Sequence, residues 1–251
     1  MAATLYAMNY SKSAHDQEPD QALHQERGKL LETVEVTTAD NPEYAVIWMH
    51  GLGADGHDFE AIIPFLGLPP TAAVRFVFPH ALMRPITING GAVMRAWYDI
   101  IEISTSKGQD EAGIRHSAAK IRDLIDHEIK RGIPAAKIVV AGFSQGGAMA
   151  LHVGLGYPER LAGIMALSAY LMFPERLHRE RSMANSATPV FIGHGIHDPM
   201  VPFALGQAAQ AELSKGHWPV EWHSYPIPHS VSQPEIADIG RWLQARFSRA
   251  G

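Results

Sequence analysis

The sequence predicts an α/β fold with a mostly parallel central sheet and helices on both of its faces. Short apolar or β-branched segments recur between residues 32 and 225, and helical patterns lie between them. Several of the strand segments are continuous apolar runs, which is typical of strands buried on both faces of a parallel sheet. Strands that alternate with helices favour right-handed βαβ units.

The expected strands are 32–38, 44–49, 74–78, 137–141, 162–167, 189–193 and 219–225. The clearest helix covers 110–131, where isoleucine and alanine recur at steps of three and four residues and Gly132 follows. This spacing places the apolar residues on one face of a helix, and glycine is the usual residue after a helix end. Weaker helical patterns cover 145–156, 203–215 and 234–248.

Domain organisation follows from the same pattern. Residues 1–28 are polar and lack periodicity, so we interpret them as a flexible N-terminal extension. We expect residues 29–251 to form a single domain. The segments 79–95 and 169–188 are too long for simple connections, which makes them candidate substrate loops, but neither is long enough for a large lid.

Composition excludes several classes of protein. The 251 residues are 46% hydrophobic and 19% charged, with a net charge of −5 and no clustered basic run, which argues against nucleic acid as a partner. Without cysteine, disulfides, thiolate zinc sites and cysteine nucleophiles are all excluded. No apolar run reaches the roughly 18 residues of a membrane span, and no secretory signal is apparent, so a cytoplasmic location is the default.

A candidate nucleophile lies between an expected strand and an expected helix. Gly142-Phe143-Ser144-Gln145-Gly146 fits G-x-S-x-G, the pattern of a nucleophile elbow. The serine must stand on a sharp, strained turn to expose its hydroxyl, and side chains two residues to either side would collide with the strand and the helix. The alternative is an ordinary serine in a glycine-rich turn.

A serine nucleophile needs a base and an acid that orients it, and in a fold of this kind the chain order is serine, acid, histidine. Asp198 follows the strand 189–193, and His229 follows the strand 219–225. Of the 14 histidines, His217 precedes that last strand and His223 lies within it, so both are poorer candidates. Asp238 is the rival acid, but it would lie inside the final helix.

The oxyanion of an acyl-transfer intermediate needs backbone donors. We expect one to be the N–H of Gln145, directly after the nucleophile, and the other to be the N–H of Leu52 in the loop His50-Gly51-Leu52-Gly53. The glycines of that loop allow its backbone to approach the substrate. We interpret His50 as a residue that braces the loop rather than as a catalytic one.

Two further functions would use some of the same residues. His194, His197 and Asp198, with His50 and His57, offer ligands for a metal-dependent hydrolase, but the pair lies in a loop and lacks the helical H-E-x-x-H spacing. A non-catalytic binding protein of this fold would be expected to lack a member of the triad. The sequence contains all three members, so we expect neither of these functions and no metal.

The motifs together resemble the bacterial carboxylesterase / lysophospholipase / acyl-protein thioesterase family of small α/β-hydrolases, from about residue 43 to 245. The resemblance is carried by HGLGADGHDF (50–59), FPHA (78–81), PITINGG (85–91), AWYDI (96–100), DEAGI (110–114), GIPAAKIVVAGFSQGGAMAL (132–151), LSAYL (167–171), GHGIHDPMVP (193–202) and YPIPHSV (225–231).

The resemblance implies an α/β-hydrolase fold, Ser144, Asp198 and His229 as the catalytic triad, the amides of Leu52 and Gln145 as the oxyanion hole, and no cofactor. It also implies a substrate cleft near Trp97 and the loop after Ser168.

We expect a serine carboxylesterase that acts on small esters or thioesters with short to medium acyl chains. A lysophospholipase or an acyl-protein thioesterase is the alternative, and a homodimer is left open. Leu171, Met172 and Phe173 are candidates for a hydrophobic acyl groove, or else they anchor the loop to the core. Pro228 and Arg95 stand where the family commonly has glycine and proline, and these differences bear on the substrate preference more than on the chemistry.

Overall fold

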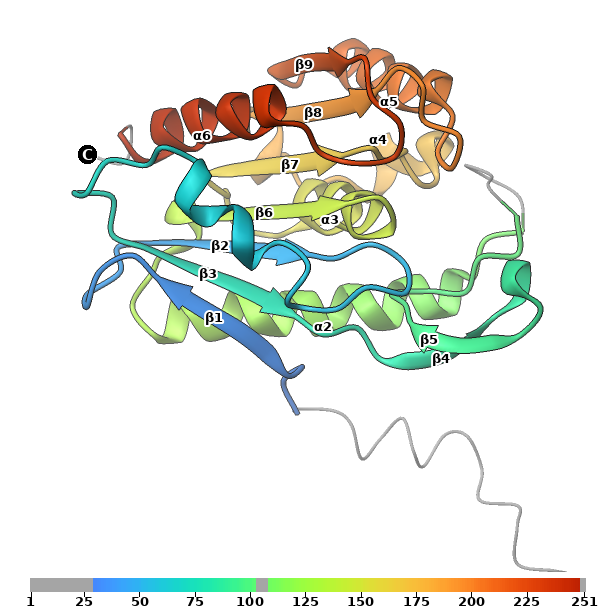
Figure 1. The fold of residues 1–251 in the computed structure, drawn as a ribbon, viewed down its shortest axis with the longest axis horizontal. Coiled ribbons are helices and arrows are strands. Elements are labelled where there is room, and N and C mark those ends of the chain that lie inside the picture. The colour runs from blue at the N-terminus through green and yellow to red at the C-terminus, as the bar shows by residue number, and fades with distance from the viewer. Residues whose placement is uncertain (1–28, 103–107, 249–251) are drawn as a thin grey trace, which may run out of the picture.

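A computed structural model describes residues 29–102 and 108–248 of the protein. The N-terminal extension expected at residues 1–28 lies outside the described residues. The described chain contains a seven-stranded sheet in the order β1-β3-β2-β6-β7-β8-β9 (Figure 1). Only β1 runs antiparallel to its neighbour, so the sheet is mostly parallel, as the sequence predicts.

All seven expected strands are present, with ends shifted by two residues or fewer. They are β1 (Thr33–Thr37), β2 (Tyr44–Met49), β3 (Val74–Pro79), β6 (Ile138–Phe143), β7 (Gly163–Leu167), β8 (Val190–Gly195) and β9 (Val220–Tyr225). The four expected helices are also present, as α2 (Glu111–Lys130), α3 (Gln145–Gly156), α5 (Phe203–Lys215) and α6 (Gln233–Phe247). The prediction of an α/β-hydrolase fold is therefore confirmed.

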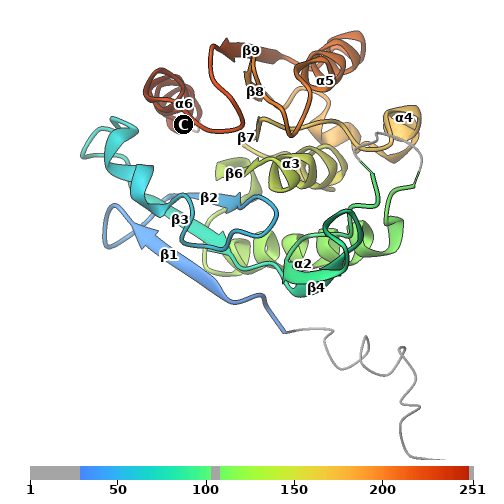
Figure 2. The same cartoon turned by 45° about the vertical axis from the view of Figure 1, so that its right-hand side comes forward.

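Helices cover both faces of the sheet, with α6 on one side and α2, α3 and α5 on the other (Figure 2). The central strand β2 shows why, because its alternate side chains enter different cores. Ile47 packs with residues of α2 and α3, whereas Val46 and Trp48 pack with residues of α6. Its residues are apolar in both directions because both faces are buried.

The two long connections contain elements that the sequence analysis did not predict. In the first, β4 (Met83–Ile86) and β5 (Ala92–Arg95) form a separate antiparallel pair. The turn between them uses Gly90 and Gly91, both at positive φ, where glycine is the favoured residue. These strands are too short for a period-2 pattern to identify them.

The second connection contains the short helix α4 (Leu177–Glu180) between the 3₁₀ turns η4 (Pro174–Arg176) and η5 (Met183–Asn185). The remaining 3₁₀ turns are η1 (Glu60–Phe65), η2 (Thr87–Asn89) and η3 (Ala135–Lys137). Across the described ranges, no helix combines the length and the apolar character that crossing a membrane requires.

Candidate active site

Ser144 stands alone between β6 and α3, and its backbone is strained. Its φ of 55° and ψ of −119° place it in a region that L-residues rarely adopt. Its N–H donates to the carbonyl of Leu167 on β7 at 2.8 Å, which fixes the turn against the sheet. A side chain at Gly142 would collide with the carbonyl of Gly146, and one at Gly146 with the carbonyl of Met49. The spacing of the two glycines is therefore a steric requirement of this turn.

Asp198 and His229 form a close pair in the loops after β8 and β9. The Nδ1 of His229 donates to the Oδ2 of Asp198 at 2.6 Å. The Oδ1 of Asp198 accepts from the backbone N–H groups of Met200 and Val201, both at 2.8 Å. Because Nδ1 carries the proton in this hydrogen bond, the Nε2 of a neutral His229 has the free lone pair.

The pair lies near Ser144. The rings of His229 and Phe143, the residue before Ser144, have centroids 4.7 Å apart. Ser144, Asp198 and His229 follow β6, β8 and β9, which run parallel in one sheet (Figure 1). All three residues therefore lie at the edge of the sheet where these strands end. This edge, outside the carboxyl ends of the strands, is where open α/β sheets bind their ligands.

The loop after β2 lies beside the serine. A Cβ at Gly51 would lie 3.5 Å from the Cβ of Ser144, which places the backbone of Leu52 in the same region. His50 braces this loop, because its Nδ1 lies 2.7 Å from the carbonyl of Gly51 and its Nε2 accepts from the N–H of Ala81 at 3.0 Å. Burial lowers the pKa of His50 to about 4, so its ring is neutral at pH 7.

The side chain of Gln145 has a structural role that the sequence analysis did not predict. Its Oε1 accepts from the N–H of Trp97 at 2.8 Å, and its Nε2 donates to the carbonyl of Tyr98 at 2.7 Å. The indole of Trp97 donates to the carbonyl of His50 at 2.9 Å. Gln145 thus ties the segment after β5 to the start of α3. The backbone N–H of Gln145 lies in the first turn of α3 and therefore has no acceptor within the helix. The partners are about 48 residues away in the chain, so no local pattern reveals them.

His194 is buried next to the Asp198 loop. Its Nε2 donates to the carbonyl of Val201 at 3.0 Å and lies 3.6 Å from the Oδ2 of Asp198. Burial lowers the pKa of His194, which favours the neutral form of its ring. His197 and His57 are exposed and lie on different loops. Among residues 29–102 and 108–248, no group of three or more His, Cys, Asp or Glu residues could hold a metal ion.

The rival residues form a separate polar group at β9 and α6. The Nδ1 of His223 lies 3.5 Å from the Oδ2 of Asp238, which also accepts from the hydroxyl of Tyr225 at 2.8 Å. His217 lies beyond the end of α5 at a φ of 65°. The rivals Asp238 and His223 therefore pair with each other rather than with His229.

The residues expected to form a substrate groove are buried. Trp97 is 1% exposed, and Leu171, Met172 and Phe173 are each 4% exposed. The last three line a cavity whose lining residues do not include Ser144, Asp198 or His229. Their place in an acyl groove stays a prediction. The guanidinium of Arg95 donates to the carbonyl of Ala81 at 2.9 Å, so this cation is held by the chain next to β4.

Comparison with known proteins identifies the family to which the chain belongs. The sequence model of the Phospholipase/Carboxylesterase family matches residues 31–246. The chain belongs to this family. The match spans the described sheet from β1 to β9 and ends near the last residue of α6.

Relatives of this family member include curated proteins and solved structures. Acyl-protein thioesterase 1 of Neurospora crassa is 40% identical over 213 residues, which cover 81% of this chain and 87% of the relative. Probable carboxylesterase Os04g0669500 of Oryza sativa subsp. japonica is 37% identical over 202 residues, covering 79% of this chain and 76% of that protein.

The crystal structure of Arabidopsis thaliana SOBER1 superposes with a TM-score of 0.75 at 32% identity, covering 81% of this chain and 98% of that one. These three relatives are eukaryotic, so the resemblance is not particular to bacterial members of the family.

Proposed function

We propose that the protein is a serine carboxylesterase that cleaves carboxylic esters through an acyl-enzyme intermediate. One observation carries the proposal: a strained Ser144 on the β6–α3 turn shares a sheet edge with the hydrogen-bonded pair of Asp198 and His229. A serine at positive φ costs free energy, and such strain is characteristic of residues whose position serves a function.

In the proposed reaction the Oγ of Ser144 attacks the ester carbonyl while the Nε2 of His229 takes the hydroxyl proton. Asp198 holds the imidazole in the required tautomer and stabilises the imidazolium that forms. The backbone N–H groups of Leu52 and Gln145 donate to the oxyanion of the tetrahedral intermediate. His229 then protonates the leaving alcohol, and water activated by the same residue releases the acid.

Substrates with short to medium acyl chains fit the surroundings of this site. Ile196 and Met200, on either side of Asp198 in the chain, are 44% and 62% exposed. Met94 lies against the loop after β2, with its Sδ 3.6 Å from where a Cβ at Gly53 would lie. These side chains offer apolar contact to a short acyl chain.

The relatives support either an ester or a thioester as the substrate, since one is named a probable carboxylesterase and another an acyl-protein thioesterase. The alternative function is therefore that of an acyl-protein thioesterase or a lysophospholipase. We further propose that the substrate is a small ester or thioester in the cytoplasm.

Measured kcat/KM values separate these functions. The substrates are p-nitrophenyl esters from acetate to palmitate, a palmitoyl thioester peptide and a lysophospholipid. A steep preference for the short esters is the expected result, and a preference for the thioester or the lysophospholipid would move the assignment to the alternative.

A fluorophosphonate probe tests the nucleophile itself. It should label the wild-type protein and leave the Ser144→Ala variant unlabelled. Equal labelling of both, or activity that is lost on adding EDTA and restored by zinc, would contradict the mechanism.

A further inference from the structure

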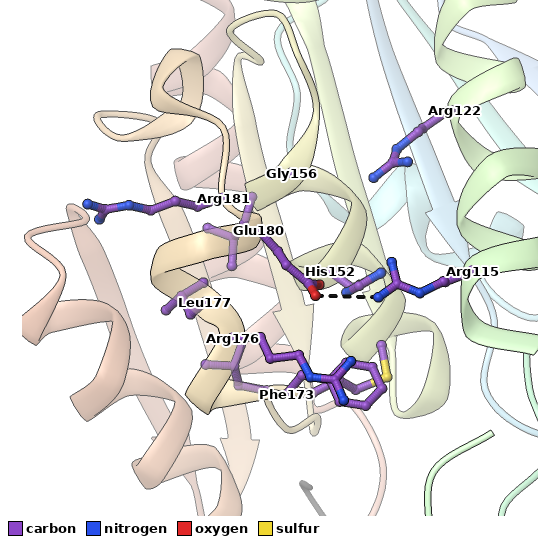
Figure 3. A pocket seen from close by; sticks show the side chains of 12 residues that line it. Arg115, Arg122, His152, Gly156, Phe173, Arg176, Leu177, Glu180 and Arg181 are labelled. Atoms are coloured by element: carbon purple, nitrogen blue, oxygen red, sulfur yellow. Dashed lines mark hydrogen bonds and ion pairs between the residues drawn. The ribbon is translucent and has the colours of Figure 1, made fainter. Parts of the chain in front are cut away.

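A cavity of about 280 Å³ lies between the helices α2, α3 and α4. α3 contributes His152, Leu155 and Gly156, and α2 contributes two arginines, Arg115 and Arg122. The far wall is the segment from Leu171 to Arg181 (Figure 3). His152 is eight residues beyond Ser144, or about 12 Å along the helix, so the cavity is separate from the candidate active site.

Most of the lining cations already have partners. Arg115 and Arg176 both donate to the Oε1 of Glu111, at 2.6 Å and 2.9 Å. Arg115 also lies 3.4 Å from the Oε1 of Glu180. The guanidinium of Arg181 lies over the ring of Trp218 and extends away from Arg122 in Figure 3. The charges of Arg115 and Arg176 are therefore offset by carboxylates, and the charge of Arg181 points away from Arg122.

Arg122 is different. Its Nε is buried, and within the described part of the chain it has neither a hydrogen bond nor an ion pair. The Nη2 of Arg122 lies 3.5 Å from where a Cβ at Gly156 would lie, so the end of the guanidinium borders the cavity. An anion in the cavity would form charge-assisted hydrogen bonds with this end. Figure 3 shows Arg122 reaching from α2 toward the space beside α3.

His152 supplies a second donor on the facing helix. Its ring lies edge-on to Phe173, with centroids 6.2 Å apart, and it makes no hydrogen bond to any residue that the structure describes. Burial lowers the pKa of His152 to about 4, so the ring is neutral at pH 7 and offers one N–H. Two donors that have no hydrogen-bond partner among the described residues thus face each other across the gap between α2 and α3.

The remaining wall is apolar. Leu155, Leu171, Met172, Phe173 and Leu177 are each 7% exposed or less and border the same cavity. A ligand that fills it needs an apolar body as well as an anionic end. Glu180 also lines the cavity, and its carboxylate would repel a dianion more strongly than a monoanion.

We propose that this cavity binds a monocarboxylate with an aliphatic tail, of the class of the medium-chain fatty acids, with the carboxylate on Arg122 and His152 and the tail against Leu155 and Met172. The volume of about 280 Å³ lies near the lower end of small-molecule sites. The proposed esterase would release acids of the same class, and this connection rests on the proposed function. The proposal of the binding site does not rest on that function.

Calorimetric titration with octanoate tests the proposal. Octanoate should bind with one site per chain, and binding should persist when Ser144 carries a phosphonate or is replaced in Ser144→Ala. Since the readout is heat and not turnover, the absence of esterase activity would refute the proposed function and leave this test intact. Binding that disappears when Ser144 is blocked would place octanoate in the active site and overturn the proposal.

Substitutions locate the carboxylate. Arg122→Gln should weaken octanoate binding about tenfold or more, because a charge-assisted hydrogen bond is lost. Arg122→Lys should retain part of the affinity, and His152→Leu should lose less than Arg122→Gln does. Arg179→Gln, on the exposed face of α4, is the matched control and should bind as the wild type does.

Unchanged binding in Arg122→Gln, confirmed as folded by circular dichroism, would refute the site. So would equal affinity for octanol, which lacks the charge, or tighter binding of inorganic phosphate, which lacks the tail.

Discussion

The Nδ1 of His229 lies 2.6 Å from the Oδ2 of Asp198, and the other oxygen of that carboxylate is held by two backbone N–H groups. The carboxylate thus cannot rotate freely, and it presents one oxygen to the imidazole. The arrangement orients His229 with its Nε2 as the base, and it depends on a group that accepts a hydrogen bond at Nδ1.

Replacing the carboxylate by an amide should remove this orientation. Asp198→Asn is expected to lower kcat for p-nitrophenyl acetate by about 10³–10⁴-fold, because the amide favours the wrong tautomer. Asp238→Asn is the matched control, since Asp238 faces His223 and Tyr225 and should leave kcat near the wild-type value. A large loss in the control with a small loss in Asp198→Asn would exchange the roles of the two residues.

His194 should act on the reaction through Asp198. Its Nε2 donates to the carbonyl of Val201 and lies 3.6 Å from the Oδ2 of Asp198. His194→Leu is expected to lower kcat about tenfold with little change in KM and to shift the pH profile of kcat/KM, since the loop loses its hydrogen bond to the carbonyl of Val201 and the polar ring beside Asp198. His194→Gln keeps an N–H donor and should recover part of kcat. If both variants lose kcat equally, His194 serves packing alone.

The side chain of Gln145 should matter for stability separately from its backbone N–H. Gln145→Leu leaves the buried N–H of Trp97 and the carbonyl of Tyr98 without partners, which is expected to cost about 2–4 kcal/mol of the free energy of unfolding. Urea denaturation measures this cost. Gln207→Leu, at an exposed position of α5, is the control and should change the free energy little. Equal stability of the two variants would show that the bridge to Trp97 and Tyr98 contributes nothing.

Glu235 should make the stability of the protein depend on pH. It is fully buried at the start of α6, and neither carboxylate oxygen accepts a hydrogen bond of normal geometry from a described residue. Burial raises the pKa of Glu235 to about 7, partly offset by the nearby backbone N–H of Ser232. The folded state therefore binds the proton more tightly than the unfolded chain, where the pKa lies near 4.5.

The sign follows from this difference. The contribution of Glu235 is fully present below about pH 4.5, falls as the pH rises toward 7 and stays lost above it. A change in pKa from 4.5 to about 7 corresponds to about 3 kcal/mol. Glu235→Gln should thus stabilise the protein at pH 8 relative to the wild type and lose that advantage at pH 4.5, as measured by urea denaturation. Glu159→Gln, at an exposed carboxylate, should show no such difference. A stability gap between wild type and Glu235→Gln that does not change with pH would rule out a buried, neutral carboxyl.

The nucleophile turn could be predicted from the sequence, because the residues that define its pattern lie close together in the chain. Gly142 and Gly146 lie within two residues of Ser144. A side chain at Gly142 would collide within the same turn, whereas one at Gly146 would collide with the carbonyl of Met49 on the neighbouring strand β2. The positions of Asp198 and His229 were also within reach of the sequence. Each follows a strand with an apolar pattern, and the carboxyl ends of parallel strands meet at one edge of a sheet.

The β4–β5 pair was beyond this kind of reasoning. Each strand has four residues, and the pair is held by cross-strand contacts such as that between Met83 and Arg95. A strand of this length shows too few alternations to be distinguished from a loop, and its pairing is decided by the partner.

The sequence by itself determined the order of strands and helices, the strained turn of Ser144 and the chain order of the candidate triad, since these depend on neighbours within a few residues or on strand polarity. Only the tertiary structure decided that Gln145 ties down Trp97, that His194 supports the loop of Asp198 and that Arg122 borders a cavity without a hydrogen-bond partner among the described residues. Each of these contacts joins side chains and backbone from elements that meet only when the sheet and its helices are packed, so no periodicity or motif encodes them.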